Sequence, residues 1–389
     1  MNCILSIILT MLLTLNTGLG GKSNSIDIDL GITSKSAILI EANTGTILYK
    51  KNENEKLKLA SVTKIMTLLL CYDEISAGNM SYDDIITFSE HAASMGGSQC
   101  FFEEGEQQTV YDIIKCIEIS SGNDAAVAMG EHISGSESEF AKLMNKRAVE
   151  LGMKNTNFVN ACGLDDDNHY SSSLDIGLMS RELITKYPQI FEISTIWMDH
   201  ITHKTAKGET RFDLANTNKF LRQYTGANGL KTGFTSDAGY CMSGTATRDD
   251  ITLIAVVMGA ETKEIRNREV GKLLDYGFAQ CNTYTDNDIF QKDFNIPLKN
   301  GVKNNVVPKL IQEHKITLIN NKPEDIIKKY EINGKLSAPI KKGDTIGYIN
   351  YYIKDKMIDQ VEITSSENIE KKSYTLSIRD LCNKFFVVE

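Results

Sequence analysis

The sequence predicts an α+β fold, in which an antiparallel β-sheet packs against a cluster of helices and a small all-β unit follows. Three observations support this fold class. Strand-like segments stand at both ends of the region from residue 37 to residue 278, and mostly helical segments stand between them. After about residue 285, short strand-like segments alternate with Asn, Gly, Lys and Asp.

Length and composition limit the function classes. The chain has 389 residues, enough for two domains and a third small unit. Its 41% hydrophobic and 24% charged residues are typical of a soluble globular protein. The 42 Lys and Arg residues against 51 Asp and Glu residues give a net charge of −9, which argues against nucleic acid as the main partner.

The first residues are typical of an export signal. Ile4 to Leu15 is almost unbroken apolar sequence, about as long as the apolar region of a signal peptide and too short to span a membrane comfortably. Small residues follow at Gly18, Gly20 and Gly21, although the first three residues contain no Lys or Arg. We predict a cleaved signal peptide over residues 1–21 and an exported protein; an uncleaved anchor is the alternative.

The cysteines do not indicate a metal site. Eight of them are scattered along the chain, with no C-x-x-C pair and no ligand spacing with His. Most of them are therefore interpreted as small buried hydrophobic residues rather than a disulfide framework. They are Cys3, Cys71, Cys100, Cys116, Cys162, Cys241, Cys281 and Cys382.

A hairpin and a set of helices are predicted for the first half. Ala37–Glu41 and Thr46–Lys50 are strand-like and joined by a turn containing Gly45. Apolar spacing then predicts helices over Ala60–Ile75, Tyr111–Ile119, Glu139–Leu151 and Leu174–Tyr187. Residues 158–170 are rich in turn formers, and residues 198–228 are predicted to be polar, irregular and placed along the rim of a cleft.

The second half is predicted to return to strands. Leu230–Thr235, Gly239–Thr247 and Ile251–Met258 are strand candidates, and the last is continuously apolar, as a central strand should be. A helix over Arg266–Phe278 follows, and the first hairpin and these strands are expected to share one sheet. The later all-β unit has strand candidates at 306–307, 316–319, 346–353 and 357–363. Residues 376–386 are predicted to form a short amphipathic helix, either a surface membrane anchor or a docked or frayed C-terminus.

Ser61 and Lys64 are the first pair of candidate catalytic residues. Three positions apart at the start of a helix, they point the same way, so the amine can reach the hydroxyl. The apolar run from Ile65 to Leu70 predicts burial, which lowers a lysine pKa and lets the amine accept a proton. A serine hydroxyl is a weak nucleophile until a base takes its proton. The pattern is common by chance, so an ordinary helix start with a surface lysine is the alternative.

Two more patterns carry candidate site residues. Ser121 and Asn123 lie two apart in a turn, so both side chains can be aimed into one cleft, although S-x-N alone is a weak signal. Lys231 and Thr232 lie on a predicted strand and offer a positive charge and a hydroxyl to a carboxylate, and Gly233 would let another group approach the backbone closely. A lysine kept on an edge strand for solubility is the alternative.

Together, S-x-x-K, S-x-N and K-T-G, on helix, turn and strand in that order, resemble the motifs of penicillin-binding proteins and serine β-lactamases. The segments 163–165, 238–240 and 272–278 are similar to D-alanyl-D-alanine carboxypeptidases of the low-molecular-mass class, and the resemblance covers nearly the whole mature chain. It implies a β-lactamase-like and transpeptidase-like catalytic domain over residues 22–282 and a β-rich domain over 285–372. A membrane-associating tail is implied over 374–389.

The resemblance implies a serine peptidase acting on peptidoglycan stem peptides that end in D-Ala-D-Ala, without a metal or other cofactor. Ser61 would attack the carbonyl between the two D-alanines, Lys64 would be the base, and Ser121 would pass the proton to the leaving amine. β-Lactam antibiotics would acylate Ser61 as substrate mimics. The enzyme would act at the extracellular face of the cytoplasmic membrane or in the cell wall, with peripheral membrane contact and no nucleic acid partner.

The substrate-binding residues follow from the same resemblance. The terminal carboxylate would be bound by lysine and threonine of K-T-G and by an arginine, for which Arg268 competes with the favoured residue. The oxyanion hole would consist of backbone N–H groups, one of them from Ser61. The implied substrate-binding residues are Asn123, Lys231, Thr232, Gly233, Phe234 and Arg266.

Three rival functions remain at this stage. A class A β-lactamase shares the motifs, but Gly122 stands where that class usually has Asp, and no glutamate motif for deacylation is found between residues 121 and 231. A D,D-endopeptidase would cut cross-links instead. A catalytically inactive protein that binds the cell wall would not need the intact catalytic motifs. Cys162 before Gly163 and a tail without clustered basic residues depart from the family pattern.

Overall fold

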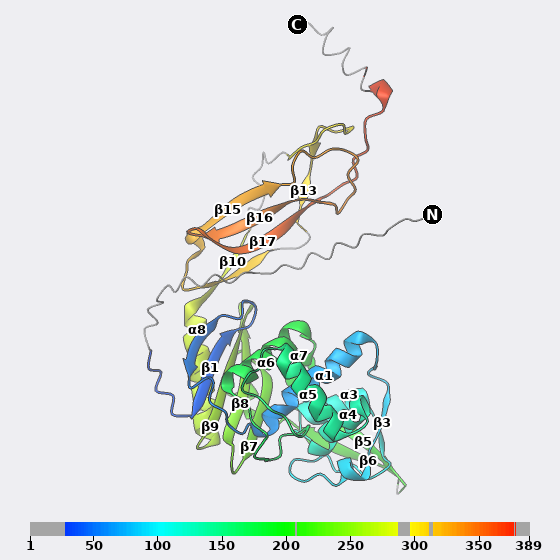
Figure 1. Cartoon of the computed structure of the whole chain (residues 1–389), viewed down its shortest axis with the longest axis vertical. Coiled ribbons are helices and arrows are strands. Elements are labelled where there is room, and N and C mark those ends of the chain that lie inside the picture. The colour runs from blue at the N-terminus through cyan, green and yellow to red at the C-terminus, as the bar shows by residue number, and fades with distance from the viewer. Residues whose placement is uncertain (1–27, 207, 287–295, 311–313, 377, 379–389) are drawn as a thin grey trace, which may run out of the picture. The chain divides into compact units, whose positions relative to one another are not determined.

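The computed structural model describes residues 28–206, 208–286, 296–310, 314–376 and 378 (Figure 1). A five-stranded antiparallel sheet in the order β2-β1-β9-β8-β7 forms the frame of the larger body. The strands are β1 (Ser36–Glu41), β2 (Ile47–Lys51), β7 (Ala227–Thr235), β8 (Gly239–Arg248) and β9 (Ile251–Ala260). The first hairpin and the three later strands therefore share one sheet, as predicted.

Helices cover both faces of this sheet because its central strands are apolar on both sides. Every residue of β1 is buried, and β9 is buried along most of its length. On one face a Cβ at Gly177 of α6 (Ser173–Lys186) would lie 2.6 Å from Ile40 Cδ1. On the other, a Cβ at Gly277 of α8 (Lys263–Gln280) would lie 2.6 Å from Leu253 Cδ1. Glycine thus lets each helix pack closely on the strands.

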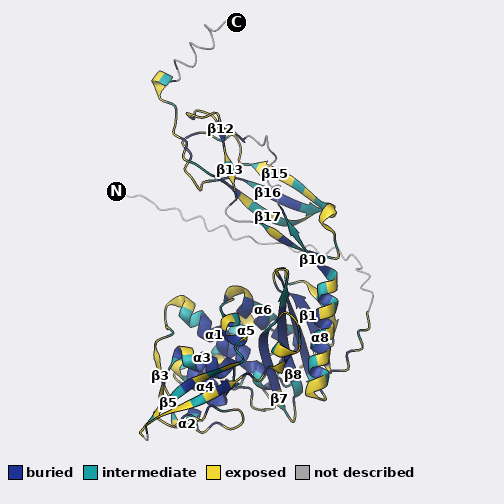
Figure 2. Ribbon diagram, turned by 180° about the vertical axis from the view of Figure 1, so that it is seen from behind, coloured by how far each residue is buried: buried dark blue, intermediate teal, exposed yellow. Residues whose placement is uncertain are grey.

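The remaining helices form a cluster around α1, whose first nine residues are all buried (Figure 2). This agrees with the prediction that its apolar run is too extensive for a surface helix. A 3-10 turn, η1 (Ala60–Thr63), leads into α1 (Lys64–Ala77), which ends at Gly78 with a φ of 75°. The other helices are α2 (Glu90–Ala93), α3 (Val110–Glu118), α4 (Asn123–Ser134), α5 (Glu137–Glu150) and α7 (Ile190–Ser194).

Capping side chains explain where several helices begin. Thr109, Ser136, Ser172 and Thr262 each accept a hydrogen bond from the backbone N–H three residues later. Such caps satisfy an amide that the helix itself leaves unpaired. The helices consequently start one to three residues before the positions that apolar spacing alone predicted.

The prediction that residues 198–228 are irregular is wrong for their first half. β5 (Met198–Thr205) and β6 (Gly208–Ala215) form an antiparallel hairpin, and a 3-10 turn, η2 (Lys219–Arg222), follows. Only Ile201, His203 and Leu214 of this hairpin are buried. With so few apolar residues on the inner face, the alternation that marks a strand is faint. A small hairpin of β3 (Ile85–Thr87) and β4 (Gln107–Thr109) was also not predicted.

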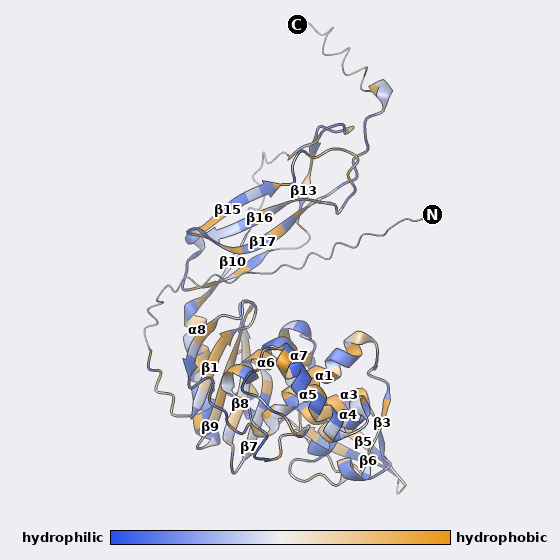
Figure 3. Ribbon diagram, in the orientation of Figure 1, coloured by the Kyte–Doolittle hydropathy of each residue, from blue (hydrophilic) through white to orange (hydrophobic). Residues whose placement is uncertain are grey.

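The C-terminal unit is all-β, as predicted, and Figure 3 shows apolar segments along its strands. Its own apolar core lies around Ile349, Tyr351 and Ile363. Its main sheet has the order β13-β17-β16-β15. The strands are β13 (Pro308–Lys309), β15 (Ile326–Ile332), β16 (Thr345–Ile353) and β17 (Lys356–Ser365). Smaller pairs join β10 (Cys281–Thr285) to β14 (Lys315–Ile319) and β11 (Ile296–Pro297) to β12 (Asn305–Val306), and a 3-10 turn, η3 (Pro323–Asp325), precedes β15.

Two sequence predictions concern residues that are mostly not described. The signal peptide at 1–21 lies outside the described residues, and so does most of the predicted helix at 376–386. Within the described part, no helix combines the length and apolar character needed to cross a membrane. The six cysteines in that part are free thiols and buried, as predicted.

Two mid-helix glycines allow a matched test of the packing. A Cβ at Gly130 of α4 would lie 2.7 Å from Phe140 Cδ1, whereas one at Gly271 of α8 would make only ordinary contacts at 3.6 Å or more. We expect Gly130→Ala to destabilise the fold by about 1–3 kcal/mol because the core is overpacked. Gly271→Ala should be neutral or stabilise by up to about 1 kcal/mol, since alanine favours helix. Thermal unfolding measures both; equal melting temperatures would contradict the close packing of α4 on α5.

Candidate active site

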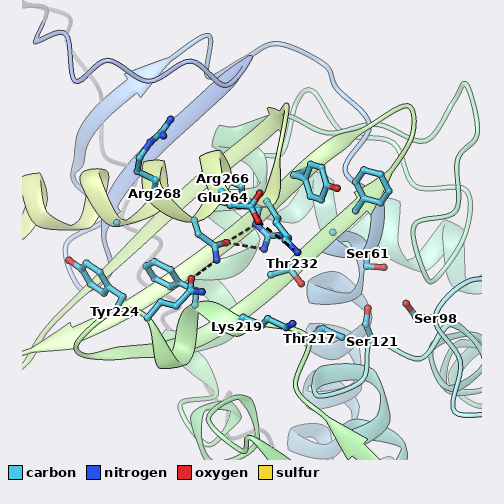
Figure 4. A pocket seen from close by; sticks show the side chains of 18 residues that line it. Ser61, Ser98, Ser121, Thr217, Lys219, Tyr224, Thr232, Glu264, Arg266 and Arg268 are labelled. Atoms are coloured by element: carbon cyan, nitrogen blue, oxygen red, sulfur yellow. Dashed lines mark hydrogen bonds and ion pairs between the residues drawn. The ribbon is translucent and has the colours of Figure 1, made fainter.

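Three segments far apart in the sequence meet at one cavity of about 690 Å³ (Figure 4). Ser61 comes from η1, Ser121 from the turn between α3 and α4, and Thr232 and Gly233 from β7. A group that enters this cavity can therefore reach both serine side chains and strand β7 together. The sequence motifs S-x-x-K, S-x-N and K-T-G thus contribute to a single site.

The amine of Lys64 is held by three oxygen atoms. Its Nζ lies 3.0 Å from Ser61 Oγ, 2.6 Å from Asn123 Oδ1 and 2.9 Å from the carbonyl oxygen of Cys162. A neutral amine has two N–H donors and one lone pair. If the two donors serve Asn123 and Cys162, the lone pair faces the hydroxyl of Ser61. This arrangement suits a base that takes the serine proton.

The surroundings favour the neutral form of this amine. Lys64 is fully buried, and burial lowers its pKa to about 7. The nearby Cys162 raises this pKa, and the positive charge of Lys231 lowers it further. Near neutral pH a large fraction of Lys64 is therefore unprotonated. The sequence predicted this from the apolar residues of α1.

Close backbone packing fixes the position of Ser61. Ala60 has a φ of 50°, and Thr63 Oγ1 donates a hydrogen bond of 2.8 Å to its carbonyl oxygen. Gly163 lies against the same carbonyl, since a Cβ there would lie only 1.9 Å from that oxygen. From β7, a Cβ at Gly233 would lie 3.0 Å from the backbone nitrogen of Ser61. Strand β7 can approach the nucleophile this closely only because Gly233 has no side chain.

The turn between α3 and α4 presents Ser121 with a φ of 62°, and the residue is 4% exposed. Asn123 ties this turn to its surroundings. Its backbone N–H donates to Ser98 O at 2.7 Å and its Nδ2 to Gly96 O at 2.7 Å, while its Oδ1 accepts from Lys64. In this structure Asn123 therefore links Lys64 to the loop at residues 96–98. Its amide carries a second N–H donor that a substrate carbonyl can use.

Lys231 is almost completely buried although β7 is an edge strand of the sheet. This burial argues against the alternative of an exposed solubilising lysine. Burial lowers its pKa to about 8; Glu118 raises this pKa and Arg266 lowers it. Within the described residues, Lys231 Nζ has no hydrogen-bond partner. A buried amine without a hydrogen-bond partner is costly, so its burial calls for an anionic partner.

The structure distinguishes the two candidate arginines. Both line the cavity (Figure 4), but Arg266 is 7% exposed and its charge acts on Lys231, whereas Arg268 is exposed. The guanidinium of Arg266 donates from Nε and Nη2 to Asn267 Oδ1 at 3.0 and 2.9 Å. The geometry therefore supports Arg266 as the residue near the carboxylate-binding strand.

Sequence reasoning missed part of the cavity wall. The loop between α2 and β4 contributes Ser98, which was not predicted, whereas Lys219 and Phe220 of η2 belong to the segment 198–228 that was predicted to lie along the rim of a cleft. Asp124 was also missed: its carboxylate accepts hydrogen bonds from the backbone N–H groups of Cys100 and Phe101 and so fixes that loop. The Asn-Asp pair at the start of α4 was the available signal, because such residues commonly bind nearby backbone amides.

Comparison with known proteins agrees with this geometry. A family model described as D-alanyl-D-alanine carboxypeptidase matches residues 22–262. The chain belongs to this family. A second model, described as the C-terminal domain of penicillin-binding protein 5, matches residues 278–371 of the enzyme.

Named relatives cover most of the enzyme. D-alanyl-D-alanine carboxypeptidase DacF of Bacillus subtilis is 41% identical over 357 residues, which are 91% of this chain and 90% of the relative. DacA of Escherichia coli is 30% identical over 362 residues, 91% of this chain and 88% of the relative. Both the expected family and the expected carboxypeptidase activity are thereby confirmed.

Solved structures give the same result. Penicillin-binding protein 5 of Haemophilus influenzae has a TM-score of 0.65 at 32% identity and covers 87% of this chain and 98% of its own. Penicillin-binding protein D2 of Listeria monocytogenes, in an ampicillin-bound form, has a TM-score of 0.54 at 32% identity, covering 64% of this chain and all of its own. The enzyme is a serine-type D-Ala-D-Ala carboxypeptidase of the penicillin-binding class, and the rival functions are not favoured.

Gly163 offers a test of how the nucleophile is positioned. We expect Gly163→Ala to lower the rate of penicillin acylation by at least about a hundredfold, because its Cβ would displace Ala60 and Ser61 from their places beside Lys64. Gly152→Ala is the control, since Gly152 has a similar positive φ of 76° but open space around it. Fluorescent penicillin labelling measures both variants. Equal losses would mean that backbone strain, rather than displacement of Ser61, is responsible.

Proposed function

We propose that this carboxypeptidase removes the terminal D-alanine of peptidoglycan stem pentapeptides through an acyl-enzyme on Ser61. The observation that carries the assignment is the buried amine of Lys64, 3.0 Å from Ser61 Oγ and with a pKa lowered to about 7. A base with a pKa near the working pH accepts a proton efficiently and can return it later. Lys64 has such a pKa, and its amine already lies within hydrogen-bond distance of Ser61 Oγ.

In the acylation step, Ser61 Oγ attacks the carbonyl carbon between the two D-alanines while neutral Lys64 takes its proton. A new C–O bond forms, and the negative charge moves to the former carbonyl oxygen. The backbone N–H groups of Ser61 and Phe234 are proposed to stabilise this oxyanion. The closeness of Gly233 to the Ser61 nitrogen supports this pairing, since it brings the following residue of β7 to the same side.

Collapse of the tetrahedral intermediate breaks the C–N bond and releases D-alanine. The leaving nitrogen needs a proton, and Ser121 is proposed to donate it and to recover one from Lys64, with Lys231 part of the same network. The position of Ser121 in the same cavity as Ser61 supports this role. Water then hydrolyses the acyl-enzyme and regenerates Ser61.

The terminal carboxylate of the substrate is proposed to bind Lys231, Thr232 and Arg266. Thr232 and Arg266 line the cavity, and the buried amine of Lys231, the residue before Thr232, is influenced by the charge of Arg266. Asn123 would orient the substrate backbone while it holds Lys64. β-Lactams carry a carboxylate and a reactive carbonyl at comparable positions, so they would acylate Ser61 in place of the peptide.

The cellular setting is part of the proposal. Residues 1–21 would be a cleaved signal peptide, 22–282 the catalytic domain, 285–372 the β-rich domain and 374–389 a tail that contacts the membrane surface. The enzyme would then be secreted to the outer face of the cytoplasmic membrane or the cell wall and influence cell shape. The cell-wall role of the family is the support for this placement.

Two substitutions test the catalytic roles. Ser61→Ala should abolish labelling by penicillin, and Lys64→Ala should slow acylation by two or more orders of magnitude, because a positioned base is lost. Mass spectrometry of the penicillin adduct should place the modification on the peptide that contains Ser61. Normal acylation of Lys64→Ala, or an adduct on another residue, would contradict the assignment.

The lowered pKa of Lys64 predicts the pH dependence of acylation. Below about pH 7 the amine becomes protonated and can no longer accept the serine proton, so the rate should fall about tenfold for each further pH unit. The second-order rate of acylation by benzylpenicillin, measured from pH 5 to pH 8, tests this. A rate that stays constant down to pH 5 would exclude Lys64 as the base.

A further inference from the structure

The charge of Lys231 is not balanced by the residues that form the known motifs. Its buried amine is influenced by Arg266 of α8, and it acts in turn on Lys64 of α1, so three basic side chains converge on one buried region. Asp124 also acts on Lys64, but its carboxylate is engaged with the backbone of Cys100 and Phe101. A buried cation without a counter-ion is costly and tends to lose its proton.

Glu118 is the carboxylate whose charge acts on Lys231. It is the last residue of α3, three positions before Ser121, and only 2% of its surface is exposed. Among the described residues, its Oε2 is buried without a hydrogen-bond partner, and the same holds for Lys231 Nζ. Ser121, three residues after Glu118, and Thr232, directly after Lys231, line the same cavity, so the buried carboxylate and the buried amine lie in one region without forming a direct ion pair.

The other groups near Glu118 cannot replace Lys231 as its partner. The hydroxyl of Tyr72 from α1 is also buried without a hydrogen-bond partner among the described residues. Burial, and to a smaller extent Glu118, raises its pKa, so the phenol remains neutral. Burial raises the pKa of Glu118 to about 7, and the positive charge of Lys231 lowers it. The carboxylate and the amine therefore each favour the charged form of the other.

We propose that Glu118 is a positioning residue for the carboxypeptidase reaction, whose carboxylate keeps Lys231 cationic for the terminal carboxylate of the substrate. This inference rests on the proposed role of Lys231. It also gives the two buried lysines different protonation states. Glu118 favours the cation at Lys231, and that cation in turn disfavours a second positive charge at Lys64, which must be neutral to act as the base.

The proposal predicts the direction in which the pH profile of the reaction shifts when Glu118 loses its charge. A negative neighbour raises the pKa of an amine, so its removal lowers the pKa of Lys231. Glu118→Gln keeps the shape of the side chain and removes the charge. Lys231 would then lose its proton at lower pH, and we expect the alkaline limb of kcat/KM to move down by about one pH unit. Near pH 6.5, where Lys231 stays protonated, the variant should resemble the wild type.

The experiment measures kcat/KM of the full chain from pH 5 to pH 10 with an acyl-D-Ala-D-Ala peptide. A second substrate is a thioester of the same acyl-D-alanine, whose neutral thiol leaving group carries no carboxylate. Rates are normalised to the active sites titrated by penicillin. At pH 9 we expect Glu118→Gln to be about tenfold slower than the wild type with the peptide and within about twofold with the thioester.

Asp112→Asn is the matched control, because Asp112 lies on the same helix and its change removes the same charge. Its profile should overlay that of the wild type. If Glu118→Gln gives no titratable sites, Glu118→Asp should restore both the sites and the wild-type alkaline limb, because it keeps the charge.

Three results would overturn the inference. They are an equal loss at every pH and with both substrates, a shift of the same size in Asp112→Asn, or an alkaline limb that moves in Glu118→Asp as well. Failure of the proposed function itself would be seen in the wild type, as absent D-alanine release or absent acylation of Ser61.

Discussion

The site depends on the burial of one amine. Lys64 can act as a base only because α1 is enclosed on most sides, so that water does not stabilise its charged form. That enclosure requires the helical cluster, and the contacts with Asn123 and Cys162 need two further segments to reach the same point. The core that stabilises the fold therefore also sets the pKa of Lys64. A change in the packing of α1 would consequently change the reactivity of Ser61.

Much of the fold could be predicted because its signals are local. The apolar run of β9, the turn at Gly45 and the apolar face of α3 all appear in short windows of sequence. The hairpin at 198–215 could not be predicted in this way, since three buried side chains give too weak an alternation. β15 was missed for a similar reason: its apolar residues do not follow the two faces of the strand, because Ile327 is exposed and Lys328 is half-buried.

The candidate site was predictable to the extent that its residues lie in short motifs. Ser61, Lys64, Ser121, Lys231 and Thr232 could be proposed from spacing and family resemblance. Contacts between residues that are far apart in the sequence could not be predicted. Examples are the Cys162 carbonyl that binds Lys64 and the loop at 96–98 that binds Asn123. Glu118 carries no motif at all, and only its burial near Lys231 marks it.

The pairing of β1 with β9 has a consequence for how the enzyme matures. Ile38 lies opposite Val256. More than two hundred further residues must therefore be synthesised before β1 can pair with β9. Pairing between strands so far apart in the sequence is slow, and it leaves an unpaired apolar strand edge that is prone to aggregation in incomplete chains. Ser61 likewise lacks its neighbouring strand until β7, which ends at Thr235, has been made. A newly made molecule would therefore be acylated by a β-lactam only after it has finished folding. Molecules that have not finished folding would not be inhibited.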